Sequence, residues 1–189
     1  MTESPPKVAV VTGGSRGIGR AIAEALARGG WSVAIGYRSS EADAKETLGA
    51  LETIGVTGLA VALDVTEEGS VTEAFRRVGD ELGPVTGLVN NAGVSRDGLL
   101  LKYPMDVYDQ TMATNLRGAF LCSRTALRGM LRAKWGRIVN MSSAVALHGN
   151  AGQTVYAATK SGLVGLTKSL AREVGGKGIT VNALCPGLL

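Results

Sequence analysis

Two side chains of the segment "YAATK", Tyr156 and Lys160, have the spacing and the chemistry of an acid–base pair. Residues four apart lie on the same face of a helix, one turn above each other, so this spacing brings a phenol next to an ammonium. A neighbouring cation stabilises a phenolate and so suits the phenol to donate its proton near neutral pH. The same spacing also arises by chance, as a packed tyrosine beside a solvated lysine. The pair alone leaves both interpretations open.

A glycine-rich stretch, "TGGSRGIG", follows the first apolar run of the chain. Its glycines, Gly13, Gly17 and Gly19, fall where a strand is expected to turn into a helix. Glycines let the backbone approach a pyrophosphate, and the helix N-terminus supplies free N–H groups and the positive end of a dipole. The spacing is G-x-x-x-G-x-G rather than the usual G-x-G-x-x-G, and a lone loop of this kind could be only a tight turn. Its place after the first strand favours dinucleotide binding.

The end of the second expected strand predicts which dinucleotide is bound. The usual fingerprint has an acidic residue about 20 residues after the glycines, where it holds the adenosine ribose 2′-hydroxyl. Here Arg38 stands at that place in "GYRSSE", and Arg16 adds a second cation inside the glycine loop. Guanidinium groups suit phosphates, so the two arginines favour NADP(H) over NAD(H). The alternative is that Arg38 is a solvated residue at the start of a helix.

Short β-branched runs alternate with longer amphipathic segments along the chain. Continuous apolar strands separated by helices predict a parallel sheet with helices on both faces, and right-handed crossovers make that sheet doubly wound. We therefore expect one α/β domain of the Rossmann type over residues 1–189. The expected strands are 7–12, 32–37, 58–64, 87–92, 137–142 and 179–185. The expected helices are 17–29, 40–53, 67–82, 105–133 and 154–175.

Composition and charge favour a cytoplasmic protein without a bound metal. The formal charge of +4 is mild and spread out, and no basic patch interleaved with aromatic residues supports nucleic-acid binding. The first residues lack a basic region followed by a long apolar run, and no stretch approaches the ~20 apolar residues of a membrane span. Cys122 and Cys185 have no metal-ligand spacing, so we expect two packed free thiols.

Further motifs line up with the glycine loop. They are "NNAG", "MATNLRGAF", "VNMSSAV" and the pair Tyr156 and Lys160. Together with "TGGSRGIG" these motifs resemble the short-chain dehydrogenase/reductase family, from about Lys7 to the last residue. No one of these motifs is specific, whereas the combination is. The resemblance implies an oxidoreductase that moves a hydride between a nicotinamide cofactor and a ketone or secondary alcohol.

The resemblance implies a catalytic tetrad, made up of Asn115, Ser143, Tyr156 and Lys160. Tyr156 would donate a proton to the developing alkoxide, and Ser143 would hydrogen-bond the carbonyl oxygen as charge builds there. Lys160 would also hold the nicotinamide ribose, and Asn115 would support a water chain that resupplies protons. Ser143 is preferred to Ser142 because it lies 13 residues before the tyrosine (156 − 143), the usual interval of the family. Without the resemblance, Ser143 could be a strand-end hydroxyl bonded to backbone and Asn115 a mid-helix kink.

The resemblance also implies a row of cofactor contacts at the ends of the strands. Asp64 matches the residue that meets the adenine, and "NAG" matches a segment that steadies the sheet and lines the adenosine side. Pro186 and Gly187 match a turn that cradles the nicotinamide end. The full set of expected cofactor-binding residues is Gly13, Ser15, Arg16, Gly17, Ile18, Gly19, Arg38, Asp64, Val65, Asn91, Ala92, Gly93, Tyr156, Lys160, Pro186 and Gly187.

Within the family, stretches such as "NNAGVSRDGLLLK" are most similar to the 3-oxoacyl-[acyl-carrier-protein] reductases of fatty-acid synthesis. This similarity implies NADPH-dependent reduction of a 3-oxoacyl thioester, an acyl carrier protein as partner, and a homotetramer. Two basic positions that dock the carrier in this subgroup match Lys134 and Lys177. The arginines at 124, 128 and 132 form either a basic helix face that steers an acidic carrier or an ordinary solvated face.

Two other functions stay open. The tetrad serves any ketone or secondary alcohol, so the substrate could be a sugar, steroid or xenobiotic carbonyl. The chain could also be an inactive cofactor-binding subunit that supports an active partner. Members of the family normally continue beyond "NALCPGLL" with a cofactor loop, two helices over the substrate and a seventh strand used in tetramer packing. We therefore expect this chain to be a C-terminally incomplete part of a longer enzyme.

Overall fold

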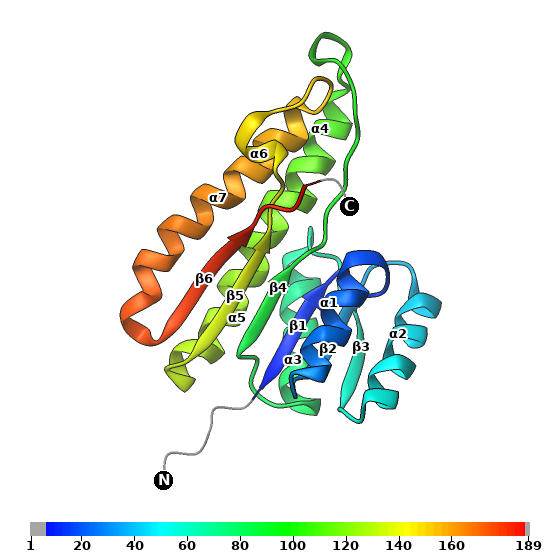
Figure 1. Ribbon diagram of the computed structural model, residues 1–189, viewed down its shortest axis with the longest axis vertical. Coiled ribbons are helices and arrows are strands. Elements are labelled where there is room, and N and C mark those ends of the chain that lie inside the picture. The colour runs from blue at the N-terminus through cyan, green and yellow to red at the C-terminus, as the bar shows by residue number, and fades with distance from the viewer. Residues whose placement is uncertain (1–6, 188–189) are drawn as a thin grey trace.

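The computed structural model describes residues 7–187, and its centre is a parallel six-stranded sheet (Figure 1). The strand order is β3-β2-β1-β4-β5-β6, so the chain winds outward from β1 first to one edge and then to the other. This is the doubly wound α/β sheet that the sequence predicted. The strands are β1 (Val8–Thr12), β2 (Ser32–Tyr37), β3 (Gly58–Ala62), β4 (Gly87–Asn90), β5 (Gly136–Met141) and β6 (Ile179–Leu184).

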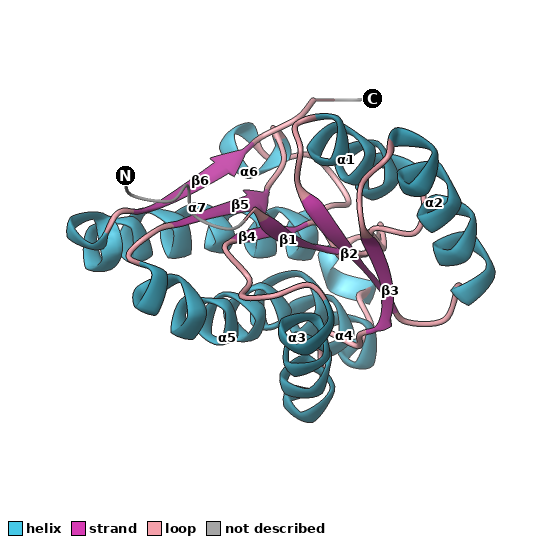
Figure 2. Cartoon of the chain, turned by 90° about the horizontal axis from the view of Figure 1, so that it is seen from below, coloured by secondary structure: helices cyan, strands magenta, loops and turns pink. Residues whose placement is uncertain are grey.

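Helices connect the strands and cover the sheet in two layers. The helices are α1 (Gly17–Arg28), α2 (Glu41–Ile54), α3 (Glu68–Glu81), α4 (Met105–Met112), α5 (Gly118–Ala133), α6 (Val145–His148) and α7 (Thr154–Val174), with the short turns η1 (Leu100–Lys102), η2 (Ala113–Arg117) and η3 (Gly175–Lys177). One hydrophobic core lies between the sheet and α3, α5 and α7, and a second lies under α1 and α2 (Figure 2). The predicted covering of both faces is confirmed around β1 and β2.

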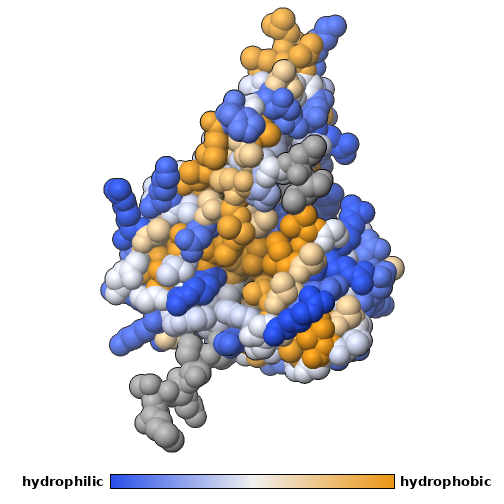
Figure 3. Space-filling view, viewed as in Figure 1, coloured by the Kyte–Doolittle hydropathy of each residue, from blue (hydrophilic) through white to orange (hydrophobic). Residues whose placement is uncertain are grey.

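The face that carries α1 and α2 is open over the other half of the sheet. Within residues 7–187, no helix lies over β5 and β6 on this side (Figure 1). Figure 3 shows apolar side chains gathered along the middle of the same face. On the opposite face, α5 and α7 pack on these strands and bury Ile138 and Val181.

The helix expected over 105–133 has a π-helical turn in its middle, η2, between α4 and α5. A π turn inserts one residue into the helical repeat and is often found at functional sites. Hydrophobic periodicity does not reveal such an insertion, because helix continues on both sides of it. Helix α6 and the turns η1 and η3 were also not predicted, since three or four residues are too few to show a period.

Two buried asparagines cross-link the central strands. Asn90 and Asn140 are partners in the register of β4 and β5, and Asn90 Nδ2 donates to Asn140 Oδ1 at 2.7 Å. Asn90 Nδ2 also donates to Ser123 Oγ on α5, and Asn140 Nδ2 donates to Thr167 Oγ1 on α7 at 2.8 Å. This network therefore ties two strands and two helices together inside the core.

The sequence also led to expectations about membrane spans and about the two cysteines. In the described part of the chain, none of the helices has the length and apolar character needed to cross a bilayer. Cys122 is buried and Cys185 is half-buried, and both are free thiols, as expected. Burial raises the pKa of the Cys122 thiol to about 12, so it stays protonated at neutral pH.

Candidate active site

The sequence motifs meet at the carboxyl ends of the strands. The glycine loop follows β1, "NNAG" begins at the end of β4, Ser143 follows β5 and Pro186 follows β6. Strands β1 and β4 are neighbours whose onward connections run to opposite edges of the sheet, so their ends separate. Ligands of open α/β sheets bind in the crevice at such a switch point.

Glycine is required in the loop after β1. Gly13 and Gly17 have φ angles of +62° and +54°, a region that residues with a side chain rarely adopt. A Cβ atom on Gly19 would lie 2.1 Å from the carbonyl oxygen of Gly13 and 2.7 Å from Nδ2 of Asn91. The start of α1 therefore packs directly on the loop, which leaves its backbone free of side chains where a pyrophosphate would lie. The loop expected from the sequence therefore fits the pyrophosphate of a dinucleotide.

Hydrogen bonds from the end of β4 hold this loop. Asn91 Nδ2 donates to the carbonyl oxygens of Thr12 and Gly13 at 3.0 and 3.1 Å. The Thr12 hydroxyl in turn accepts from the backbone N–H groups of Asn91 and Ala92, at 3.0 and 2.9 Å. The two sides of the crevice are thus joined at its base.

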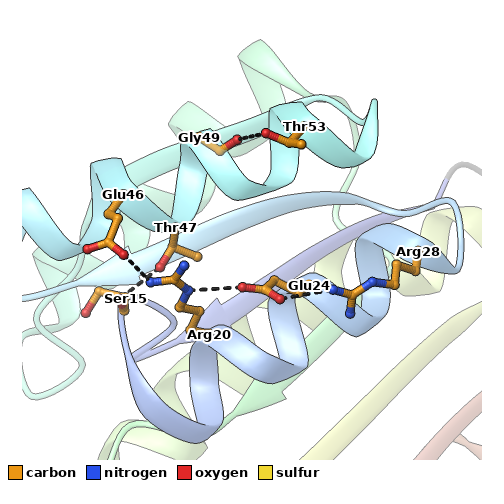
Figure 4. Close-up of polar contacts among 8 residues, drawn as sticks. All are labelled: Ser15, Arg20, Glu24, Arg28, Glu46, Thr47, Gly49 and Thr53. Carbon is orange, nitrogen blue, oxygen red and sulfur yellow. Dashed lines mark hydrogen bonds and ion pairs between the residues drawn. The ribbon is translucent and has the colours of Figure 1, made fainter.

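Helix α2 supports the loop from the other side (Figure 4). The buried hydroxyl of Thr47 donates to the carbonyl oxygen of Ser15 at 2.9 Å. Arg20, one turn into α1, forms ion pairs with Glu24 at 3.0 Å and with Glu46 of α2 at 2.6 Å. Sequence reasoning missed Thr47 and the pair between Arg20 and Glu46, because no local pattern shows which helices become neighbours.

The adenosine half of the crevice is a cleft of about 460 Å³. Arg16 and Arg38 are exposed on its lining, and no ion pair or side-chain hydrogen bond involves either of them within residues 7–187. The carboxylate of Asp64 is fixed by the backbone N–H and the hydroxyl of Thr66, at 2.9 and 2.8 Å. The lining includes the expected residues Gly13, Ser15, Arg16, Gly17, Ile18, Gly19, Arg38, Asp64, Val65, Asn91, Ala92 and Gly93.

The second half of the crevice is a cleft of about 750 Å³ that contains the expected reacting groups. Ile18, Asn91, Gly93 and Val94 line both clefts, so the two halves form one continuous groove. The lining of the second half includes the expected residues Ser143, Tyr156, Lys160, Pro186 and Gly187.

Lys160 is buried at the base of this second cleft, with 5% of its surface exposed. Its ammonium donates to the carbonyl oxygen of Met141 at 2.6 Å and lies 5.6 Å from the ring centre of Tyr156. Burial lowers the pKa of Lys160 to about 8. The same-face arrangement expected from "YAATK" is therefore present, with the lysine inside the protein rather than in solvent.

The two serines at the end of β5 differ in their surroundings. Ser142 is buried, and its hydroxyl donates to the backbone carbonyl of Lys160 at 2.8 Å. Ser143 is half-buried, and its hydroxyl oxygen accepts a bond from the N–H of Val145 at 3.3 Å. Because that bond occupies a lone pair, the Ser143 proton stays available to a ligand. The geometry thus agrees with the choice of Ser143.

Asn115 lies behind the cleft rather than on its lining. It sits in the π turn η2, is 1% exposed, and hydrogen-bonds the loop after β4 with both ends of its amide.

The loop after β4 is also joined to the loop before α7, since Gly98 N–H donates to Gly152 O at 2.8 Å. His148, to which the sequence assigned no role, is also on the lining of the second cleft.

A family model described as short chain dehydrogenase matches residues 7–189. The chain belongs to the short-chain dehydrogenase family. The resemblance expected from the motifs is confirmed, and the protein is an oxidoreductase that acts on ketone or alcohol groups.

The curated relatives of this short-chain dehydrogenase cover nearly all of the chain. A protein named 3-oxoacyl-[acyl-carrier-protein] reductase FabG from Pseudomonas aeruginosa is 47% identical over 183 residues, which are 97% of this chain and 74% of the relative. The protein of the same name from Vibrio cholerae is 46% identical over 97% of this chain and 73% of the relative. A crystal structure of a candidate short-chain alcohol dehydrogenase from Sinorhizobium meliloti has a TM-score of 0.94 and 38% identity, and covers 99% of this chain and 74% of that one.

The two lysines expected to dock a carrier lie at the other end of the sheet of this short-chain dehydrogenase. Lys134 ends α5 with a left-handed φ of 50°, Lys177 ends η3, and both are exposed. A Cβ on Gly178 would lie 2.3 Å from the carbonyl oxygen of Lys134, so the two turns touch. These turns precede β5 and β6, whose opposite ends carry Ser143 and Pro186, about 20 Å away for strands of this length. Docking at these positions stays a prediction.

Proposed function

We propose that this protein uses NADPH to reduce 3-oxoacyl thioesters, presented on an acyl carrier protein, to their 3-hydroxyacyl forms. The observation that carries this proposal is the joint presence of Ser143, Tyr156 and Lys160 in one cleft of a chain that is 47% identical to a 3-oxoacyl-[acyl-carrier-protein] reductase. The fold alone does not identify a substrate, because proteins of one fold catalyse many different reactions.

The adenosine half of the groove supports the choice of NADP(H). A 2′-phosphate needs cations that no carboxylate already neutralises, and Arg16 and Arg38 have no ion-pair partner within residues 7–187. By contrast, Arg20 and Arg28 are paired with glutamates. The residues proposed to hold the cofactor are the lining residues of the two clefts that were expected from the sequence.

The bound cofactor would supply a hydride to the carbonyl carbon, and the residues of this chain manage the proton and the charge. Tyr156 donates its phenolic proton to the carbonyl oxygen, and the ammonium of Lys160 stabilises the phenolate that remains. Ser143 donates a hydrogen bond to the same oxygen. The carbonyl of Met141 fixes the position of the ammonium beneath the ring.

A second candidate is the dehydrogenation or reduction of another secondary alcohol or carbonyl, which the description of the Sinorhizobium meliloti neighbour favours. The deciding experiment measures NADPH oxidation with acetoacetyl thioesters of a carrier protein and of coenzyme A, beside sugar, steroid and xenobiotic carbonyls. We expect the highest kcat/KM for the carrier thioester. A higher value for a non-thioester would favour the second candidate, and no turnover at all would indicate a cofactor-binding subunit.

We also propose that the active protein is a homotetramer in which Lys134 and Lys177 receive the acidic carrier. Both side chains are exposed and their turns are adjacent, which supports contact of both with one partner. Analytical ultracentrifugation of the purified protein tests the assembly, for which we expect four copies. A monomer that has full activity would refute the tetramer.

A further inference from the structure

Thr159 lies between Tyr156 and Lys160 on α7 and is completely buried. Its hydroxyl donates to the backbone carbonyl of Tyr156 at 2.7 Å. The same oxygen accepts a hydrogen bond from Nδ2 of Asn115 at 3.2 Å. One hydroxyl group therefore joins the helix that carries the proton donor to the π turn that carries Asn115.

The hydrogen bonds at Thr159 and at Val94 together fix the orientation of the Asn115 amide. Because the Thr159 proton is already donated to Tyr156, the hydroxyl offers Asn115 only a lone pair, which must face Nδ2 and not Oδ1. In this orientation Asn115 Oδ1 accepts from the N–H of Val94 at 2.8 Å, and Nδ2 also donates to the Val94 carbonyl at 2.9 Å. A flipped amide would set donor against donor at Val94 and acceptor against acceptor at Thr159.

The contacts of Asn115 reach the wall of the cleft. Val94 and its neighbour Gly93 line both halves of the groove. A Cβ on Gly93 would lie 3.4 Å from Asn115 Oδ1 and 3.6 Å from the Lys160 ammonium nitrogen. The loop after β4 thus lies next to both the amide and the ammonium.

We infer that Thr159 is a positioning residue for the reaction. By anchoring the Asn115 amide to α7, it fixes the Gly93–Val94 wall of the cleft relative to the wall that carries Tyr156 and Lys160. It does not touch the reacting atoms, and its effect passes through Asn115. This inference rests on the proposed roles of Tyr156 and Lys160.

The chain provides a matched control on the same helix. Thr167 is 6% exposed, and its hydroxyl donates to the backbone carbonyl of Leu163 at 2.7 Å. It accepts a hydrogen bond from Asn140 Nδ2 at 2.8 Å. Thr167 therefore makes the same kinds of hydrogen bond as Thr159, about two helical turns further along α7.

The experiment compares Thr159→Val, Thr159→Ser and Thr167→Val in the purified full chain, with NADPH and acetoacetyl-CoA. Each valine removes two buried hydrogen bonds, so we expect similar losses in Tm. Only Thr159→Val should lower kcat, by roughly ten- to hundredfold, with KM values within about twofold of wild type. Thr159→Ser keeps the hydroxyl and should restore most of kcat. Thr159→Ala carries the same expectations if the valine variant does not fold.

Hydrogen exchange of the cofactor-free protein provides a readout that does not depend on turnover. Loss of the bond that anchors Asn115 to α7 should speed exchange of the Val94 N–H in Thr159→Val, and exchange should be unchanged in Thr167→Val. Unchanged kcat and unchanged exchange in Thr159→Val would overturn the inference, as would a serine variant as impaired as the valine variant. If the wild-type protein turns over no carbonyl, the proposed function fails, and the exchange comparison still decides whether Thr159 anchors Asn115.

Discussion

The ammonium of Lys160 is held 2.6 Å from the carbonyl oxygen of Met141, with only 5% of the lysine exposed. The cation is therefore solvated mainly by a backbone dipole from the end of β5 and by the face of the Tyr156 ring. Burial favours the neutral amine, which lowers the pKa from its ordinary 10.5 to about 8.

Replacing Lys160 with methionine should stabilise the folded protein at neutral pH, by an amount that falls at high pH. Between pH 8 and 10.5 the unfolded chain binds more protons at Lys160 than the folded protein does, so the wild-type free energy of unfolding rises with pH in this window. The lowered pKa corresponds to an upper limit of roughly 3 kcal/mol. Urea unfolding at pH 7, 8, 9 and 10 measures the difference between Lys160→Met and wild type. A difference that does not change with pH would contradict the lowered pKa.

Replacing Tyr156 with phenylalanine should abolish most turnover and spare cofactor binding. Loss of a general acid costs about 10²- to 10⁴-fold in rate, and the phenyl ring keeps the shape of the cleft. Stopped-flow kinetics gives kcat, and fluorescence titration with NADPH gives Kd, which should stay within about twofold of wild type. Tyr103→Phe is the control, because its hydroxyl bonds the carbonyl of Arg96 on an exposed loop. Activity retained in Tyr156→Phe would remove the tyrosine from the mechanism.

Replacing Arg38 with alanine should weaken NADPH binding selectively. A hydrogen-bonded charge pair is worth about 1.5–3 kcal/mol, which corresponds to roughly ten- to hundredfold in Kd, and NADH lacks the phosphate that would use it. Calorimetric titration with both cofactors measures the change. Arg28→Ala is the control, since Arg28 is paired with Glu24 at the far end of α1. Equal weakening of NADH and NADPH would show that Arg38 does not select the phosphate.

Replacing Gly19 with alanine should destabilise the protein and impair NADPH binding, since its Cβ would overlap the Gly13 carbonyl at 2.1 Å. Gly49, exposed in the middle of α2 (Figure 4), has nothing within 4 Å of its Cβ position. Gly49→Ala should therefore stabilise the protein by about 0.5–1 kcal/mol. Thermal unfolding with and without NADPH measures both variants. A Gly19→Ala variant with wild-type Tm and cofactor affinity would refute the close packing of the loop.

Reversing the charge of Lys134 and Lys177 together should raise KM for acetoacetyl-carrier protein and spare acetoacetyl-CoA. Rim charges act mainly on the association rate, so the effect should shrink as salt is raised. Arg76→Glu, on the exposed surface of α3, is the charge-reversal control. Steady-state kinetics with the two thioesters at low and high salt checks the expectation. An equal rise in KM for both substrates would exclude carrier docking at these lysines.

The alternation of apolar strands and amphipathic helices predicted the sheet, because burial on both faces leaves a clear pattern in each segment. That the expected cofactor residues would line one groove was also predictable, since turns after consecutive parallel strands must meet at one edge. The hydrogen bonds that support the site could not be predicted from the sequence. In the sequence, Thr159 and Thr47 look like ordinary helix residues. Their hydroxyls matter because they hydrogen-bond the tertiary neighbours Asn115 and Ser15. The π turn was hidden for the same reason, because its insertion matters only relative to α7 and the loop after β4.

The paired amides of Asn90 and Asn140 have a consequence for how the chain folds. Parallel strands have no hairpin turn to set their alignment, so β4 and β5 must find each other across a long helical connection. Sliding β5 by one position would place Val139 or Met141 opposite Asn90 and leave both amides buried without each other. Each orphaned group costs about 1–3 kcal/mol, whereas two apolar side chains would tolerate the slip far better. The pair therefore favours the native register of β4 and β5 over registers shifted by one residue.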